Sequence, residues 1–135
     1  MILSFILLEK SYSIYKFRNG SVLPDWVCSS DFYSITKTSD ELSVVALQTD
    51  IYPEAITCNR DWRILKIVGP LDFSVTGVIA DITDILEKKK ISVFVISTYD
   101  TDFVLVKQEK LDGAVNVLRE KGHNILMDQT IHKTL

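Results

Sequence analysis

The sequence of 135 residues predicts an α+β protein whose C-terminal half follows the order strand, helix, strand, strand, helix, strand. Three observations support this order: an apolar run that ends at a Gly-Pro turn, apolar residues at helical spacing after the turn, and two β-branched runs joined by a polar hairpin. This is the ferredoxin-like βαββαβ arrangement. In it, two helices would cover one face of an antiparallel four-stranded sheet.

The first strand and helix of this arrangement flank the Gly-Pro turn. Apolar residues between Trp62 and Val68 predict the strand, and Gly69-Pro70 ends it. Asp72 or Ser74 can accept hydrogen bonds from the free amides of a first helical turn, so we expect the helix to begin between these two residues. Its inward positions, at the spacing of one helix face, are Val75, Val78, Ile79, Ile82, Ile85 and Leu86.

The hairpin and the second helix complete the unit. Two runs rich in β-branched and aromatic residues, Ile91–Ile96 and Phe103–Val106, predict strands, and the turn formers between them predict an antiparallel hairpin. The basic run 88–90 before them suits the negative end of a helix dipole. A helix from about Leu111 to Lys121, capped by Gly122, and a short strand at Ile125–Met127 follow.

The first half of the chain carries a weaker copy of this hairpin. Phe32–Val45 overlies Val93–Val106 without a gap, at an offset of 61 residues. Such a repeat indicates two related units. The first unit is degenerate, because Leu23–Cys28 has room for only a short helical turn. We expect the units to span residues 1–58 and 59–135.

The N-terminal apolar run, Ile2–Leu8, is predicted to be a buried strand. A secretory signal would carry a basic segment before the run, whereas this run begins directly after Met1 and reaches Glu9 and Lys10 at once. A second strand is expected at Ser11–Arg18. No run approaches the roughly 20 apolar residues of a membrane span. The sequence therefore predicts a cytoplasmic protein with no membrane partner.

Composition and charge argue against several functional classes. The net charge is −3 and the only basic cluster is 88–90, which disfavours nucleic acid as a partner. Cys28 and Cys58 have no metal-site spacing and are interpreted as reduced thiols, although their spacing leaves a disulfide open. His123 and His132 lack a matching carboxylate or thiol. No metal and no cofactor are expected.

Two segments of the second unit carry a family resemblance. GPLDFSVTG (Gly69–Gly77) and ISVFVISTYDTDFVLV (Ile91–Val106) resemble the ACT domain, in particular small bacterial proteins with two ACT-like units. These units are similar to those of aspartate kinases and of cytosolic arginine sensors. The resemblance implies a regulatory module that binds an amino acid or a related metabolite between two ACT domains. It leads us to expect a homodimer with one site per chain.

The residues at the two turns suit such a ligand chemically. A helix start offers backbone amides and hydroxyls to a carboxylate, and Ser97 and Thr98 add further hydroxyls. Asp100 or Asp102 could accept from an ammonium or a guanidinium group. The candidate ligand-binding residues are Gly69, Pro70, Leu71, Asp72, Phe73, Ser74, Thr76, Ser97, Thr98, Asp100 and Asp102.

Each of these residues also has a structural interpretation. Asp72 or Ser74 can simply cap the helix, Leu71 and Phe73 can belong to a core, and the hairpin aspartates can satisfy their own backbone. Three functional hypotheses remain. The first is a non-catalytic amino-acid sensor. The second is an interaction module that pairs through exposed sheet edges, and the third is a small enzyme that uses a hairpin aspartate. No catalytic motif is present, so no catalytic residue is assigned.

Overall fold

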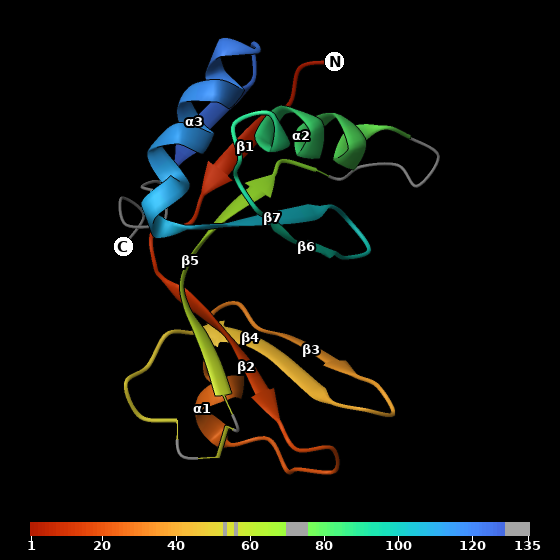
Figure 1. Ribbon diagram of the computed structural model, residues 1–135, viewed down its shortest axis with the longest axis vertical. Coiled ribbons are helices and arrows are strands. Elements are labelled where there is room, and N and C mark those ends of the chain that lie inside the picture. The colour runs from red at the N-terminus through yellow and green to blue at the C-terminus, as the bar shows by residue number, and fades with distance from the viewer. Residues whose placement is uncertain (53, 56, 70–75, 129–135) are drawn as a thin grey trace. The chain divides into compact units, whose positions relative to one another are not determined.

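The computed structural model describes residues 1–52, 54, 55, 57–69 and 76–128. The chain forms two compact units (Figure 1). The N-terminal unit is Lys10–Trp62. The C-terminal unit combines Met1–Glu9 with the described residues from Arg63 onward. This division differs from the expected boundary after residue 58, because the first nine residues pair within the C-terminal unit and the strand β5 (Thr57–Ile67) contributes to both units.

The N-terminal unit is an antiparallel sheet with one short helix. Its strands follow the order β3, β4, β2 and the first part of β5. Tyr15, Phe17 and Val44 lie in its core with Val27 of the helix. The helix has only four residues, which confirms the expected single helical turn. The elements are β2 (Tyr12–Phe17), α1 (Asp25–Cys28), β3 (Ser34–Lys37) and β4 (Leu42–Leu47).

The C-terminal unit confirms the predicted order strand, helix, strand, strand, helix, strand. Its sheet has the order β6, β7, the last part of β5, β1 and β8. The expectation of four antiparallel strands was wrong, since β1 lies between β5 and β8 and is parallel to β8. The elements are β1 (Ser4–Leu7), α2 (Val78–Glu87), β6 (Phe94–Ser97), β7 (Asp102–Lys107), the 3-10 turn η1 (Gln108–Lys110), α3 (Leu111–Glu120) and β8 (Asn124–Met127).

The inserted strand completes the apolar face on which the helices pack. Phe5 and Leu7 of β1, and Leu3 just before it, belong to the same buried cluster as residues of α2 and α3. Both helices are drawn beside this sheet in Figure 1. Side chains two apart in a strand share one face of the sheet, so a single face receives both helices. The sheet contributes Leu65, Ile67, Val104, Val106 and Ile125 to this cluster, and the helices contribute Val78, Ile82, Ile85, Leu86, Leu111, Ala114, Val115, Val117 and Leu118.

Helix α2 begins later than the sequence indicated. Its first residue is Val78, preceded by Gly77 with φ +83°, whereas the prediction placed the start between Asp72 and Ser74. A left-handed residue cannot continue a right-handed helix, so the helix starts after Gly77. Of the predicted inward positions, Val78, Ile82, Ile85 and Leu86 are buried, Ile79 packs against them, and Val75 lies outside the described residues.

We predict that Gly77→Ala destabilises the protein by about 1–2 kcal/mol, because an L-residue is strained at this φ. A Cβ at Gly77 would meet nothing within 4 Å, so the cost is purely conformational. Gly113→Ala is the matched control, since Gly113 lies inside α3 and its Cβ would sit 3.7 Å from Ile91 Cδ1. Urea unfolding should show a loss for the first variant only. Equal losses in both variants would contradict this explanation.

The hairpins of the two units close in the same way. The Thr98 amide donates to the Thr101 carbonyl at 2.8 Å, and the Thr38 amide donates to the Glu41 carbonyl at 2.9 Å. Strand pairing is Ser97 with Asp102 in one hairpin and Lys37 with Leu42 in the other. The structural offset is therefore 60 residues, and the predicted offset of 61 was wrong by one. The correct alignment of the two hairpins places Thr38 on Thr98, whereas the prediction aligned the apolar runs beside them.

Two further expectations concern the cysteines and the membrane. Cys28 and Cys58 are free thiols, the first exposed and the second half-buried, so they do not form a disulfide here. Among the helices that the structure describes, none has the length and apolar character needed to cross a membrane.

Candidate ligand site

A buried hydrogen bond joins the β6–β7 turn to the end of β5. The Thr101 hydroxyl donates to the carbonyl of Ile67 at 2.7 Å, and Thr101 is 5% exposed. Ile67 is the last residue of β5, two residues before Gly69. The bond therefore places the polar turn beside the point where the chain leaves β5 towards the Gly-Pro segment. We call Thr101 and the described candidate residues of the two segments the loop site: Gly69, Thr76, Ser97, Thr98, Asp100, Thr101 and Asp102.

The role of Thr101 was missed in the sequence. It was grouped with the turn formers, yet it is one of the few buried polar residues in the part of the chain that the structure describes. Thr101 lies one residue before β7, and its residue type carries no signal that its hydroxyl is buried. The equivalent position in the N-terminal unit is Glu41, which is only half-buried. The anchor to β5 is thus specific to the C-terminal unit.

Ser97 and Asp102 form a pair at the mouth of the hairpin. The Ser97 hydroxyl donates to Asp102 Oδ1 at 2.5 Å, where β6 ends and β7 begins. Asp102 is half-buried, and its second oxygen accepts no hydrogen bond from the residues that the structure covers. This oxygen can therefore accept from a ligand ammonium while Ser97 fixes the orientation of the carboxylate.

Thr98 and Asp100 have different surroundings. The Thr98 hydroxyl donates to the Thr101 carbonyl at 3.1 Å and accepts from the Thr101 amide at 3.4 Å, so its hydrogen-bonding capacity serves the turn itself. Asp100 is exposed at the tip of the turn. Thr98 therefore satisfies the backbone of its own turn, as the structural interpretation expected. Asp100 makes no hydrogen bond or ion pair with the residues that the structure describes.

The second segment with candidate residues leads to the start of α2. Gly69 and Thr76 are exposed, and Gly77 supplies no side-chain cap to the helix. The first backbone bond of the helix runs from the Asp81 amide to the Gly77 carbonyl at 2.9 Å. The amides of the first turn thus have no capping group from Gly77 and suit an anionic oxygen. The predicted site residues Pro70, Leu71, Asp72, Phe73 and Ser74 lie outside the described residues.

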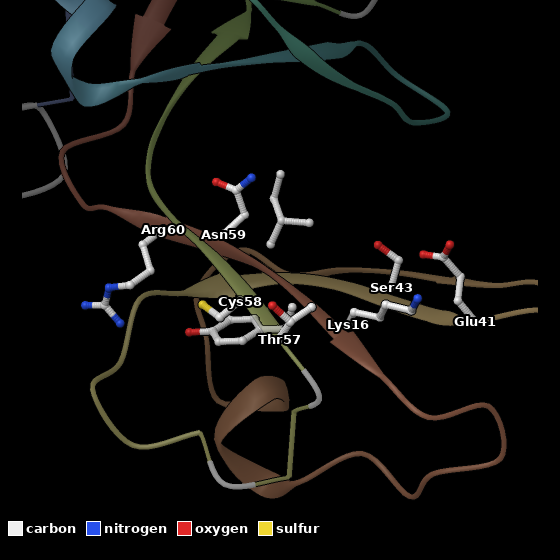
Figure 2. A pocket seen from close by; sticks show the side chains of 9 residues that line it. Lys16, Glu41, Ser43, Thr57, Cys58, Asn59 and Arg60 are labelled. Atoms are coloured by element: carbon white, nitrogen blue, oxygen red, sulfur yellow. The ribbon is translucent and has the colours of Figure 1, made fainter.

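A pocket with a volume of about 520 Å³ lies in the N-terminal unit. Figure 2 shows that the side chains of Lys16 and Glu41 project to the same side of it. Arg60, also in its wall, is directed to the Thr49 carbonyl at 2.8 Å and to Asp50 at 2.9 Å. The pocket is a wide depression on a sheet and lacks a turn anchored like that of Thr101. It is therefore the weaker candidate for an amino acid.

Tyr15 forms part of this pocket wall and is fully buried. Its hydroxyl donates to the Leu47 carbonyl at 3.0 Å and accepts from the Thr49 amide at 3.2 Å. Burial raises the pKa of Tyr15 above its ordinary value of 10.0, despite the lowering effect of hydrogen bonds and of Arg60. The neutral phenol is thus the form that the folded protein favours.

We predict that this shift makes the folded protein less stable in strong alkali. The unfolded chain loses the phenol proton at its ordinary pKa of 10.0, before the folded protein does. The stabilisation is therefore complete below that pH and is lost as the pH rises through the higher pKa of the folded state. The free energy of unfolding, measured in urea from pH 9 to pH 12, should fall less steeply in Tyr15→Phe than in the wild type. Parallel curves would contradict the assignment.

The described residues contain no group of three or more His, Cys, Asp or Glu side chains placed to hold a metal ion. Cys28, Cys58 and His123 therefore do not converge on a common metal position in this part of the molecule. The loop site consists of backbone groups, hydroxyls and carboxylates alone. Such a set of groups suits a small organic ligand that carries one positive and one negative charge.

Comparison with known proteins assigns both halves of the chain to described families. The ACT domain model matches residues 57–120, and a model for an N-terminal domain matches residues 10–54. A crystal structure from Agrobacterium tumefaciens is 31% identical, covers 95% of each chain and has a TM-score of 0.86. The ligand-free regulatory subunit of aspartate kinase from Thermus thermophilus shares the fold, with 12% identity, coverage of 84% and 93%, and a TM-score of 0.59.

A curated relative matches the chain over a shorter stretch. The human cytosolic arginine sensor for mTORC1 subunit 1 is 34% identical over 65 residues, which is 47% of this chain. The match spans only 20% of the length of that protein. The order β5, α2, β6, β7, α3 of the C-terminal unit agrees with the ACT domain model. Residues 57–120, nearly half of the chain, thus match the ACT domain family.

Proposed function

We propose that this protein is a non-catalytic sensor that binds an amino acid at the loop site, at an interface between two ACT domains. The observation that carries the proposal is the hydrogen bond from Thr101 to Ile67, which holds a polar turn beside the end of β5. The names of the relatives, an arginine sensor and a regulatory subunit of aspartate kinase, support an amino acid as the ligand.

The proposed contacts follow the two charges of an amino acid. The carboxylate binds the first-turn amides of α2 and the segment from Gly69 to Thr76, and the ammonium binds the free oxygen of Asp102. Asp100, at the exposed tip, meets the side chain of the ligand. The site residues proposed in the segment after β5 are Gly69, Pro70, Leu71, Asp72, Phe73, Ser74 and Thr76, and those in the turn are Ser97, Thr98, Asp100 and Asp102.

One ligand binds per chain in this proposal. The N-terminal unit has a four-residue helix in place of α2, and Glu41 stands where the C-terminal unit has the anchoring Thr101. Two chains then pair as a homodimer with two symmetric sites. The ligand regulates by binding one arrangement of the ACT domains more tightly than the other. In keeping with the cytosolic relative, we place the protein in the cytoplasm, without nucleic acid or membrane as partners.

An interaction module without a ligand is the second candidate. The observation in its favour is the apolar exposure at two strand segments: Ile35 of β3 is 40% exposed, and Leu126 and Met127 of β8 are 54% and 44% exposed. Strand edges of this kind can pair with a second chain. The two candidates differ in one respect, since only the sensor changes its stability when an amino acid is added.

The first experiment is a thermal-shift screen of the purified protein against the twenty amino acids. A ligand at a hundredfold its dissociation constant should add roughly 2.7 kcal/mol of stability. A shift confined to one amino acid or one chemical group of them supports the sensor and names the ligand. A flat response, together with a dimer in sedimentation experiments, would support the interaction module instead.

We predict that Thr98→Val and Thr38→Val differ in their response to the ligand. Each threonine hydroxyl donates to the carbonyl and accepts from the amide of the residue three positions later, and the Thr38 hydroxyl also accepts from the Asp40 amide. Each substitution should therefore lower stability by about 1 kcal/mol. Only Thr98→Val alters the loop site, and it should reduce the ligand-induced shift in the thermal assay. The sensor assignment would be wrong if Thr38→Val reduced the shift as much as Thr98→Val did.

A further inference from the structure

A separate pocket of about 480 Å³ lies in the helix layer of the C-terminal unit. Its wall comes from α2, from the residues that follow α2, from α3, and from His123 just before β8. The volume is within the usual range for small-molecule sites, about 300–1,000 Å³. The loop site is formed by other residues, so this pocket is independent of the amino acid proposed there. The polar residues that matter here are Asp81, Asp84, Lys88, Lys89, Lys121 and His123.

The charges of the pocket leave two ammonium groups available. Lys88 pairs with Asp84 at 3.0 Å, and this contact raises the pKa of Lys88. Neither Lys89 nor Lys121 has a carboxylate within ion-pair distance among the residues that the structure describes. Two unpaired lysines in the wall of one pocket attract an anion, in a protein whose net charge is otherwise −3.

His123 gives the pocket a second, uncharged feature. The ring is buried, and its Nδ1 accepts a hydrogen bond from the Leu3 amide at 3.0 Å. In the neutral ring the proton must then be on Nε2. That nitrogen lies 3.8 Å from Asp81 Oδ2, too far for a direct hydrogen bond. A donor and an acceptor therefore face each other across a gap in the pocket wall.

A hydroxyl group fits this gap, because a single oxygen can accept from Nε2–H and donate to the carboxylate. An oxygen placed off the line between the two atoms can lie about 2.8 Å from each. A phosphate oxygen without a proton could not satisfy Asp81. The gap therefore selects a hydroxyl, whereas Lys89 and Lys121 select an anion.

We propose that this pocket binds a sugar phosphate, with the phosphate on Lys89 and Lys121 and a sugar hydroxyl between His123 and Asp81. The sugar phosphate is either free or part of a nucleotide, since both carry the two groups that the pocket recognises. Binding requires no catalysis and no metal. A bound ligand would join α2 to α3 and to the start of β8, and so stabilise the helix layer of the C-terminal unit.

Calorimetric titration of the full chain at low ionic strength tests this proposal. The probes are inorganic phosphate, ribose 5-phosphate and AMP. Ribose 5-phosphate should bind more tightly than inorganic phosphate, because only the sugar phosphate has a separate hydroxyl that can enter the gap while its phosphate lies on the lysines. AMP binding equal to or tighter than ribose 5-phosphate identifies a nucleotide as the natural source, and weaker AMP binding identifies a free sugar phosphate. Absence of heat and of any thermal shift with all three probes would overturn the proposal.

Surface variants assign the binding to the pocket. Lys89→Gln with Lys121→Gln should weaken binding of ribose 5-phosphate by roughly tenfold or more, since two charge-assisted contacts are lost. The control variant, Lys37→Gln with Lys110→Gln, removes the same two positive charges at positions outside the pocket. It should bind ribose 5-phosphate like the wild type. Asp81→Ala should remove the advantage of ribose 5-phosphate over inorganic phosphate, and Asp112→Ala should keep it. Equal affinities in the two double variants would overturn the assignment.

Discussion

Thr101→Val is expected to abolish the stabilisation that an amino acid gives to this protein. Valine has the same shape as threonine but cannot donate to the buried carbonyl of Ile67. The loss of one hydrogen bond that leaves a buried acceptor unsatisfied should lower the free energy of unfolding by about 1–3 kcal/mol. The β6–β7 turn then no longer has its anchor at the end of β5. Urea unfolding gives the first effect, and thermal shift with the selected amino acid gives the second.

Thr101→Ser is the control for this prediction, because serine keeps the hydroxyl and loses only a methyl group. It should retain most of the ligand-induced shift. If Thr101→Val bound the amino acid with the affinity of the wild type, the anchored turn would not be part of the binding site. The loop site would then be wrongly placed, whatever the change in stability.

Phe5→Ala is expected to unfold the C-terminal unit well before the N-terminal one. Phe5 has no exposed surface and pairs with Ile67 of β5 on one side and Ile125 of β8 on the other. The rings of Phe5 and His123 contact each other edge to face, with centroids 5.9 Å apart and planes at 88°. Truncation of a buried phenylalanine costs about 3–5 kcal/mol, because a cavity remains after the contacts are lost.

The two tryptophans make this prediction measurable, since Trp26 and Trp62 both belong to the N-terminal unit. In urea, the circular dichroism of Phe5→Ala should begin to change at a lower concentration than the tryptophan fluorescence. Ile2→Ala serves as the control: its side chain is 72% exposed, and the substitution should change stability by less than about 0.5 kcal/mol. A Phe5→Ala variant as stable as Ile2→Ala would contradict the position of β1 in the sheet.

Local periodicity explains why so much of the C-terminal unit could be predicted. The hairpin follows from two β-branched runs around a polar turn, and α3 follows from one apolar helix face closed by Gly122, whose φ is +94°. The place of β1 could not be predicted in this way. Its alternation shows one buried face but says nothing about the partner strand, which lies about 60 residues away in β5 and about 120 away in β8.

The errors at single residues have local causes. The start of α2 was placed too early because Asp72 and Ser74 are good capping residues, whereas the left-handed Gly77 sets the boundary. The site residues were chosen by type, and type alone did not distinguish Thr98, whose hydroxyl closes the turn, from Thr101, whose hydroxyl anchors the turn to β5. His123 was set aside for lack of a metal pattern, and its burial against Leu3 has no signal in the sequence.

Hydrogen exchange with and without the stabilising amino acid tests the central claim most directly, because it reports which backbone amides the ligand protects. The account predicts added protection in two places: the first turn of α2 after Gly77, and the turn from Ser97 to Asp102. The matching turn of the N-terminal unit, Thr38 to Glu41, should exchange at an unchanged rate. Added protection in that turn and along the first part of β5, with none at the loop site, would contradict the account.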